Sequence, residues 1–377
     1  MELSKQQEAA LKAAVKWFNN WDPDKKPFFY LGGFAGCGKT TLAEFFEREI
    51  ASKPGRIVRC AFTGKAAMRL QQTTGKAAST IHSCIYHLVE DPKSPQPQFE
   101  LNTKDSPFIG AKLVELDECS MVNEEMGEDI LSFKVPVLVL GDPGQLPPPK
   151  GTGFFTKRKP DVMLTEVHRQ ALDSPILRLA TDIRNGKNIG RMNEPDCLVY
   201  PFSKDYDLEQ EMLLADQMLT GKNVIRESIN HRTRRLRGFT DTYPEVGDKL
   251  ICIKNQRNLN LFNGLLGNVT QVKSADMDRV LLDIETEIGE RKDVEIIPEC
   301  FTDMETVQGI PFRDRREFSE FDWGYCLTVH KSQGSQWDSV LLLDDGFLNW
   351  KKEERGRWLY TAVTRAAKRL VVLNRRS

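Results

Sequence analysis

Three short clusters of this chain combine residue types and spacings that suit the chemistry of a nucleoside triphosphate. The first runs from Gly33 to Thr40 and satisfies the pattern GxxxxGK[ST], between an apolar run at 27–31 and helical apolar spacing at 42–50. Glycines let backbone N–H groups curl around a polyphosphate, and the positive end of the following helix faces the same anion. In such a loop Lys39 reaches the outer phosphates and the Thr40 hydroxyl ligates Mg²⁺. The expected nucleotide-binding residues are Gly33, Phe34, Ala35, Gly36, Cys37, Gly38, Lys39, Thr40 and Thr41.

The other two clusters follow apolar runs and supply groups that hydrolysis needs. Asp117 and Glu118 come directly after the run 112–116. An aspartate there holds Mg²⁺ through water, and a glutamate orients and deprotonates the attacking water. Alone, such a pair is more often a loop, but here it follows a phosphate loop at a spacing that one α/β domain allows. Gln145 follows the run 135–140 and can sense a γ-phosphate, because ligands bind at the carboxyl ends of parallel strands.

The elements that must position these clusters alternate between strand and helix patterns. Apolar runs at 27–31, 56–62, 112–116 and 135–140 predict buried strands, and residues 4–19 have the apolar spacing of a helix. A second α/β half without a phosphate loop follows, with its patterns at 164–169, 174–185, 217–223, 325–329, 340–343, 357–365 and 369–373. We therefore expect an α/β protein with two parallel sheets.

Two stretches interrupt this alternation. Residues 89–107 contain four prolines and one aromatic residue, Phe99, which indicates an inserted hairpin. Short alternating runs between 247 and 298, with the turn signal Asn263-Gly264, predict a small antiparallel β-module.

Composition limits the class of protein. The 377 residues predict two or three domains, and 40% hydrophobic with 28% charged residues describes a soluble globular chain. No apolar stretch approaches the ~20 residues of a membrane span, and the first residues lack the character of a signal peptide. The eight cysteines are scattered, with neither a CxxC pair nor zinc spacing, so we expect reduced thiols, a cytoplasmic location and no structural metal.

A net charge of −1 leaves room for a local basic groove that binds nucleic acid. One basic run could form it or could equally be the solvated face of a helix. It consists of Arg226, His231, Arg232, Arg234, Arg235 and Arg237.

The order of these stretches resembles superfamily 1 helicases, specifically the 1B branch with its RecD-like and phage Dda-type members. The resemblance runs through the two α/β halves, over roughly 230 to 260 residues. Its motifs are Gly33–Thr40, Ala61–Ala67, Ser79–His82, Asp117–Ser120, Gly141–Pro148, Leu164–Arg169, Thr328–Ser335 and Leu359–Arg365. It implies two RecA-like domains: residues 1–158, carrying a pin-like insertion at 87–107, and residues 159–242 with 320–377. It makes residues 243–319 an SH3-like β-barrel insertion.

The resemblance also assigns roles to single residues. It implies that Gln7 reads the adenine and that Arg169 and Arg365 reach the γ-phosphate from the second domain, where an arginine can contribute ~10³–10⁵ in rate. Without its motif, Arg365 would be a cation that stabilises a helix C-terminus. The residues placed along single-stranded nucleic acid are Thr63, Lys65, His82, Thr328, His330 and Lys331.

Two departures from the family pattern concern nucleic acid. Phe62 stands where the RecD-like motif usually has proline, and the β-insertion is short beside that of Dda-type relatives. We predict that the 89–107 insertion is the strand-separating wedge with Phe99 at its tip, the alternative being that Phe99 pins the insertion onto its own domain.

The sequence thus predicts an ATP- and Mg²⁺-dependent 5′→3′ DNA helicase, with polarity and DNA preference resting on the resemblance. It would act as a monomeric motor on single-stranded DNA and duplex junctions in a bacterial or phage-infected cell. Alternatives are a translocase that displaces proteins and unwinds poorly, a motor that prefers RNA, and an ATP-gated single-strand binding module. The intact catalytic set argues against the last alternative.

Overall fold

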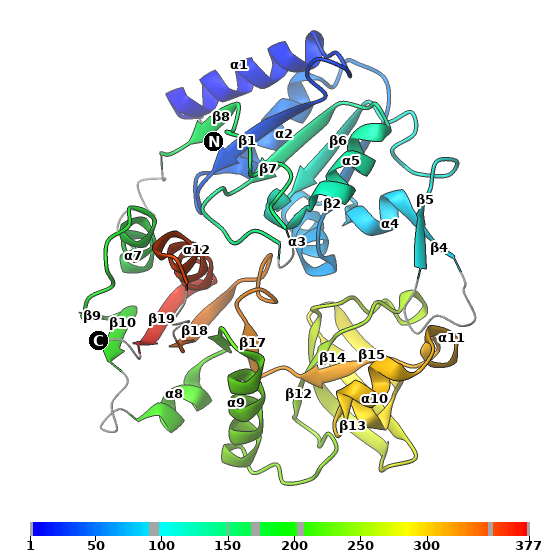
Figure 1. Ribbon diagram of the computed structural model, residues 1–377, viewed down its shortest axis with the longest axis vertical. Helices are drawn as coiled ribbons and strands as arrows, with labels where there is room; N and C mark the ends of the chain where they lie inside the picture. Colours follow the sequence, from blue (N-terminus) through cyan, green and yellow to red (C-terminus); the bar gives the residue numbers. More distant parts are fainter. Residues whose placement is uncertain are drawn as a thin grey trace. The chain divides into compact units, whose positions relative to one another are not determined.

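The computed structural model describes residues 3–89, 98–148, 151–166, 174–201, 207–345 and 350–374 (Figure 1). Arg169 and prolines 92, 95 and 97 of the predicted pin lie outside these ranges. Contacts divide the chain into two compact units. Unit 1 comprises Met1–His87, Glu100–Asn188 and Lys351–Thr364, and unit 2 comprises Leu88–Phe99, Ile189–Trp350 and Arg365–Ser377. The predicted domain boundaries at 158, 242 and 319 stay predictions.

Unit 1 is built on a six-stranded parallel sheet with the strand order β3-β2-β6-β7-β1-β8. The strands are β1 (Phe28–Gly33), β2 (Ile57–Ala61), β3 (Ser79–Thr80), β6 (Leu113–Asp117), β7 (Val137–Gly141) and β8 (Val162–Leu164). The four predicted strands of this half are confirmed. In the centre of the sheet, β1 pairs in register with β7, Phe28 opposite Val137 and Gly32 opposite Gly141.

Helices cover both faces of this sheet. They are α1 (Lys5–Asn19), α2 (Lys39–Glu49), α3 (Gly64–Thr74), α4 (Ile81–Ile85), the 3₁₀ turn η1 (Cys119–Met121) and α5 (Glu124–Ser132). Helices α7 (Pro175–Arg184) and α12 (Lys352–Val363) also belong to unit 1, where they contact each other. Phe29 and Leu31 of β1 pack in one core with α1 and α2, whereas Phe28 and Tyr30 pack in another with α4 and α5 (Figure 1). Because side chains alternate along a strand, burial on both faces explains the unbroken apolar run of β1.

Unit 2 contains a second sheet of six strands in the order β17-β11-β18-β19-β10-β9. The strands are β9 (Met192–Glu194), β10 (Cys197–Pro201), β11 (Gln217–Thr220), β17 (Cys326–Thr328), β18 (Trp337–Asp344) and β19 (Ala366–Asn374). Among these six strands, only the edge strand β9 is antiparallel to its neighbour, and the other pairings are parallel. Helices α8 (Leu208–Leu214) and α9 (Asn223–Leu236) pack on it through a core that includes Met212 and Ile229.

The predicted β-module is a five-stranded sheet in the order β15-β14-β13-β12-β16, and every pairing within it is antiparallel. Its strands are β12 (Lys249–Cys252), β13 (Leu266–Ala275), β14 (Val280–Thr286), β15 (Gly289–Ile296) and β16 (Phe321–Trp323). The short elements η2 (Arg257–Leu259), η3 (Pro298–Cys300), α10 (Met304–Gly309) and α11 (Phe312–Arg315) accompany it. An isolated parallel bridge joins Ile296, at the end of the edge strand β15, to Ser319, which lies just before the other edge strand, β16.

The remaining two-stranded sheet pairs β4 (Tyr86–Val89) with β5 (Gln98–Leu101), at the predicted pin. Asn102 N donates to Ile85 O (2.7 Å) and the Tyr86 hydroxyl to Asp129 (2.5 Å), so the root of this hairpin is tied to unit 1. None of the described helices is long and apolar enough to cross a membrane.

The basic run on α9 does not form a single open groove. Arg226 and Arg234 are buried and paired with Asp322 and Asp248, respectively. Arg234 also donates to the carbonyl oxygens of Asp241 (2.7 Å) and Tyr243 (3.1 Å). A nucleic-acid surface that uses all six cations is therefore wrong, because a buried guanidinium needs these partners to offset its desolvation.

Candidate active site

The phosphate loop joins β1 to α2 and contains two glycines in the left-handed region of backbone conformation. Gly36 and Gly38 have φ values of 79° and 74°, which residues with a Cβ rarely adopt. Gly38 is the N-cap of α2, so the first amides of this helix point toward the loop. Lys39 Nζ donates to Gly33 O (2.7 Å) and Phe34 O (3.2 Å), which holds the cation across the mouth of the loop. This geometry suits a polyphosphate.

The carboxylates predicted for metal and water lie at the carboxyl end of β6, two strands from β1. Glu118 N donates to Asp117 Oδ1 (2.8 Å), and Glu118 itself has a φ of 53°. Left-handed backbone at a residue other than glycine costs about 1–3 kcal/mol and is concentrated at functional sites. Burial raises the pKa of Asp117 to about 6, the Glu118 charge adds to this shift, and the Lys39 charge opposes it.

The oxygen atoms that the candidate site of unit 1 offers to a metal suit Mg²⁺. Asp117, Glu118 and the Thr40 hydroxyl offer hard oxygen atoms, which Mg²⁺ prefers to nitrogen or sulfur. Within the described ranges, no group of three or more His, Cys, Asp or Glu residues could hold a metal by itself. Mg²⁺ is typically held by one or two carboxylates together with substrate phosphates and water.

The turn after β7, between β6 and β1, brings Gln145 to the same edge of the sheet. Gln145 is buried, and no donor in the described parts of the chain reaches its Oε1. Asp142 organises the turn, since its Oδ1 accepts from Gly144 N (2.9 Å) and its carbonyl oxygen from Gln145 N (3.2 Å). Burial raises the pKa of Asp142, and the Lys39 charge opposes that shift. An amide oxygen without a protein donor among the described residues is suited to accept a hydrogen bond from a bound water or ligand.

Two residues that sequence reasoning missed border the phosphate loop. The Tyr360 hydroxyl on α12 donates to Asp142 Oδ2 (2.6 Å) and accepts from Ala35 N (3.3 Å). The Arg184 guanidinium on α7 stacks 3.5 Å from the centroid of the Phe34 ring. Neither residue has a local signal, because 325 residues separate Ala35 from Tyr360 in the sequence.

Gln7 lies against the phosphate loop, with both ends of its amide in use. Its Nε2 donates to Cys37 O (3.2 Å), and its Oε1 accepts from Ser4 N (3.0 Å) in a capping box that begins α1. The neighbouring Gln6 Oε1 accepts from Thr165 N (2.9 Å) and Glu166 N (3.0 Å). The adenine contact of Gln7 stays a prediction.

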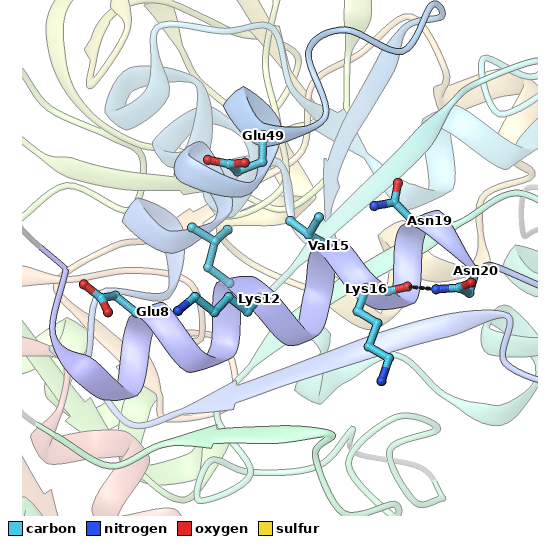
Figure 2. A pocket seen from close by; sticks show the side chains of 8 residues that line it. Glu8, Lys12, Val15, Lys16, Asn19, Asn20 and Glu49 are labelled. Atoms are coloured by element: carbon cyan, nitrogen blue, oxygen red, sulfur yellow. Dashed lines mark hydrogen bonds between the residues drawn. The ribbon is translucent and has the colours of Figure 1, made fainter.

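The groove of about 510 Å³ shown in Figure 2 is a separate feature of unit 1. It runs along α1 from Glu8 to Asn20 and reaches Glu49, the last residue of α2, whereas Lys39 is the first. Lys16 O accepts from Asn20 Nδ2 (2.8 Å) at one end. Because no residue of the phosphate loop lines it, this groove is not the nucleotide site.

The structure brings the residues of unit 1 that were predicted to contact nucleic acid to one edge of its sheet, where β2 and β3 pair with Ala61 opposite Thr80. Thr63 is the N-cap of α3, and its side chain accepts from Ala66 N (3.1 Å). Lys65 is only 9% exposed, and the ring centroid of His82 lies 4.8 Å from that of Tyr86.

In unit 2 the predicted residues follow β17. Thr328 Oγ1 accepts from Lys331 N (3.3 Å), the Lys331 side chain is exposed, and burial lowers the pKa of His330. Arg365 is buried and donates to Ser335 O (3.0 Å). Phe99 of β5 is 44% exposed, so it is not packed away in a core.

Two family models match parts of this chain. The family model described as "AAA domain" matches residues 2–195, and the model "UvrD-like helicase C-terminal domain" matches residues 324–373. The first range contains the phosphate loop and the carboxylates, and the second contains Thr328 and Arg365.

Two curated relatives are helicases. The ATP-dependent RecD2 DNA helicase of Deinococcus radiodurans is 26% identical over 365 residues, which cover 90% of this chain and 46% of the relative. The ATP-dependent DNA helicase dda of Enterobacteria phage T4 is 33% identical over 177 residues, covering 44% of this chain and 39% of the relative. The chain thus spans less than half the length of these curated relatives.

Among solved structures, the Pif1 helicase from Bacteroides in complex with ADP-AlF3 and ssDNA superimposes with a TM-score of 0.59 at 18% identity, covering 99% of this chain and 92% of that one. The Pif1 helicase from Candida albicans gives a TM-score of 0.58 at 18% identity, covering 99% and 94%. These similarities show that the parallel sheets have the RecA-like helicase fold. With its matching family models, ordered motifs and helicase relatives, the chain belongs to superfamily 1B, the branch of RecD-like and Dda-type helicases.

Proposed function

We propose that this protein is an ATP-dependent DNA helicase that moves 5′→3′ along single-stranded DNA and separates duplex. The observation that carries the proposal is the arrangement of the edge of one sheet: Lys39 follows β1, Gln145 follows β7, and Asp117 and Glu118 follow β6. The names of two relatives, both ATP-dependent DNA helicases, support it. So does the Pif1 structure, which holds a nucleotide analogue and single-stranded DNA.

In this proposal each residue of unit 1 has one task in hydrolysis. Lys39 leaves its carbonyl partners for the outer phosphates, and Thr40 and Asp117 hold Mg²⁺, which supplies neutralising charge when bound. Glu118 takes the proton of the attacking water, a role that contributes typically 10²–10⁴-fold. Gln145 senses the γ-phosphate, and Gln7 reads the adenine. Arg169 and Arg365, supplied by the second RecA-like domain, stabilise charge on the γ-phosphate.

Single-stranded DNA would run along the edges of the two sheets. Thr63, Lys65 and His82 would contact it in unit 1, and the set that follows β17 would contact it in unit 2. Lys331 is exposed, which supports a phosphate contact there, whereas the half-buried His330, whose pKa is lowered by desolvation, suits a neutral hydrogen-bonding role.

We further propose the division into RecA-like domains 1–158 and 159–242 with 320–377, and an SH3-like barrel at 243–319. The isolated Ile296–Ser319 bridge, which joins the end of β15 to the segment just before β16, supports the barrel, because closure removes exposed strand edges. A monomeric motor in the cytoplasm completes the proposal.

One set of assays tests the function. The purified chain should hydrolyse ATP faster when oligo-dT is added, and it should unwind a fork with a 5′ single-stranded tail. A matched fork with a 3′ tail should stay paired. Stimulated hydrolysis without strand separation would instead identify a translocase, and absence of hydrolysis would overturn the proposal.

Phe99 is proposed as the working tip of the strand-separating wedge. Its 44% exposure supports this role over packing in a satellite core. Opening one base pair costs ~1.4 kcal/mol per step, and a stacked aromatic ring recovers ~1–3 kcal/mol per base. Phe99→Ala should keep oligo-dT-stimulated hydrolysis and lose fork unwinding. Unwinding at the wild-type rate would remove Phe99 from the mechanism, and a loss of thermal stability would identify a packing residue.

A further inference from the structure

The hydroxyl of Tyr360 joins two parts of the nucleotide site within unit 1. It donates to Asp142 Oδ2 (2.6 Å) and accepts from Ala35 N (3.3 Å). A hydroxyl has one donor and two acceptor positions, so it satisfies both partners at once. The Tyr360 side chain is 2% exposed, and a Cβ built on Gly144 would lie 3.1 Å from its ring. The glycine at 144 therefore permits the close approach of this ring to the turn after β7.

Ala35 lies inside the phosphate loop, whose amides are the groups that bind a polyphosphate. Tyr360 thus occupies a donor that a phosphate oxygen would use. A hydrogen bond to a charged phosphate is roughly twice as strong as one to a neutral hydroxyl. A bound phosphate therefore displaces the Tyr360 hydroxyl from Ala35 N.

The other partner, Asp142, organises the turn that carries Gln145. Its carboxylate is held by Gly144 N (2.9 Å) as well as by Tyr360. The same helix makes a second bond to this turn, from Leu146 N to Thr361 Oγ1 (2.9 Å). Helix α12 ends at Val363, and its C-cap Thr364 is followed directly by Arg365. One tyrosine thus connects the phosphate loop, the turn of the sensing glutamine and the helix that precedes Arg365.

We propose that Tyr360 is a positioning residue that reports the occupancy of the phosphate loop to the Gln145 turn and to α12. Without nucleotide, its hydroxyl bonds to both Ala35 and Asp142. With a phosphate on Ala35 N, it keeps only Asp142, so α12 stays attached to the turn and is released from the loop. This inference rests on the proposed function, because it names a regulatory contact of the same site.

Tyr360→Phe tests the inference because it keeps the ring and removes only the oxygen. Removing the competitor at Ala35 N should tighten binding of ADP and of a non-hydrolysable ATP analogue about 2- to 10-fold. The oligo-dT-stimulated kcat should fall about 10-fold or more, because the turn of Gln145 loses an anchor and small misplacements are costly. A purely structural residue would lower affinity and kcat together.

Two matched variants separate this effect from loss of a buried bond. The Tyr325 hydroxyl in unit 2 has the same chemistry, donating to Asp248 Oδ1 (2.8 Å) and accepting from Lys249 N (3.1 Å). Thr361→Val removes the neighbouring anchor of α12 and leaves Ala35 untouched. Tyr325→Phe and Thr361→Val should keep nucleotide affinity within about 2-fold of the wild type.

The inference is overturned if Tyr360→Phe binds nucleotide no more tightly than the wild type, or if either control also tightens binding. It is equally overturned if kcat is unchanged. If the wild type hydrolyses no ATP, the proposed function fails, yet the affinity comparison still decides the role of Tyr360.

If Tyr360→Phe does not fold, 3-fluorotyrosine at position 360 of the full chain replaces it. Its ¹⁹F resonance should move on addition of ADP and the one at position 325 should not; a static resonance at 360 overturns the inference.

Discussion

Five parallel strands have the same order in the two six-stranded sheets of this protein, and their carboxyl ends can be compared position by position. The series β3-β2-β6-β7-β1 of unit 1 corresponds to β17-β11-β18-β19-β10 of unit 2. At the edges the sequences agree. Thr80-Ile81-His82 begins at the end of β3 and Thr328-Val329-His330 at the end of β17. In both, the threonine hydroxyl accepts from the amide three residues on, Ser83 N at 3.1 Å and Lys331 N at 3.3 Å.

After the next strand inward the two sequences again agree, but the shared residues lie at different distances from the start of the helix. Thr63-Gly64-Lys65 follows β2, and Thr220-Gly221-Lys222 stands at the end of β11. Thr63 is the N-cap of its helix, whereas Thr220 is still in its strand and Lys222 is the N-cap of α9. The same triplet therefore sits at the same junction, displaced by two residues relative to the helix start.

At the centre of the two sheets, the sequences that follow the strands differ. β1 leads into the phosphate loop, whereas the sequence after β10, from Phe202 to Asp207, contains no glycine. An acidic pair ends the third strand of both series, Asp117-Glu118 in unit 1 and Asp344-Asp345 in unit 2. Asp345, however, accepts from Gly221 N (3.1 Å) and Lys222 N (3.0 Å) and so holds a loop. An acidic pair after a strand becomes a catalytic candidate only beside a phosphate loop.

Glu118→Gln compared with Asp345→Asn tests this distinction most strongly. Glu118→Gln should lower kcat for ATP hydrolysis about 10²–10⁴-fold and retain nucleotide binding, because the proposed base is lost and the proposed Mg²⁺ ligand Asp117 remains. Asp345→Asn should keep kcat and cost at most about 1–2 kcal/mol of unfolding free energy, since asparagine retains one acceptor. Steady-state kinetics and urea unfolding give the two numbers. If Glu118→Gln turned over near the wild-type rate, the assignment of the water-activating residue would be wrong.

Lys65→Ala and Lys222→Ala test whether the shared triplet means a shared ligand. If each lysine neutralises one phosphate of single-stranded DNA, each variant should reduce the slope of log affinity against log salt by about 0.7. Oligo-dT affinity measured over a salt series shows this directly. An effect of Lys65 alone would mean that the two-residue displacement at the start of α9 separates the junctions in function. Lys222 is the more exposed of the two side chains.

Much of unit 1 could be predicted from the sequence because its signals are local. The loop Gly33–Thr40 has a fixed spacing, and the apolar runs of β1, β6 and β7 are buried on both faces. The contacts of Tyr360 and Arg184 with the phosphate loop could not be predicted, because they join segments far apart in the sequence. The equal ends of β3 and β17 were missed for another reason: three residues are too short a repeat to notice without the strand order.

The basic run of α9 shows a different limit. Charge alone could not tell a groove from a solvated face, and the structure shows a third arrangement for two of its members. Arg226 and Arg234 face inward toward Asp322 and Asp248, which lie 96 and 14 residues away. The pairing depends on where the five-stranded sheet packs against α9, and no local pattern encodes that packing. Arg234 also stacks 3.9 Å from the centroid of the Trp323 ring, so its role is structural.

The smallest expected effect concerns the matched threonines at the ends of β3 and β17. Loss of a helix-capping hydroxyl costs typically ~1 kcal/mol, so Thr80→Ala should destabilise α4 by about that amount. Thr328 is followed by a turn and not by a helix, so Thr328→Ala should cost the segment 329–332 the net worth of one hydrogen bond, about 0.5–1.5 kcal/mol. Hydrogen exchange of peptides covering these segments measures each opening separately. Thr→Ser at either position keeps the hydroxyl and is the matched control. The Thr80 hydroxyl also donates to Ser83 Oγ (2.9 Å). The hydrogen bond that Thr328 Oγ1 accepts from a backbone amide (3.3 Å) is longer than the one that Thr80 Oγ1 accepts (3.1 Å). Thr80→Ala should therefore have the larger effect, and the reverse order would show that the two ends, alike in sequence, are stabilised in different ways.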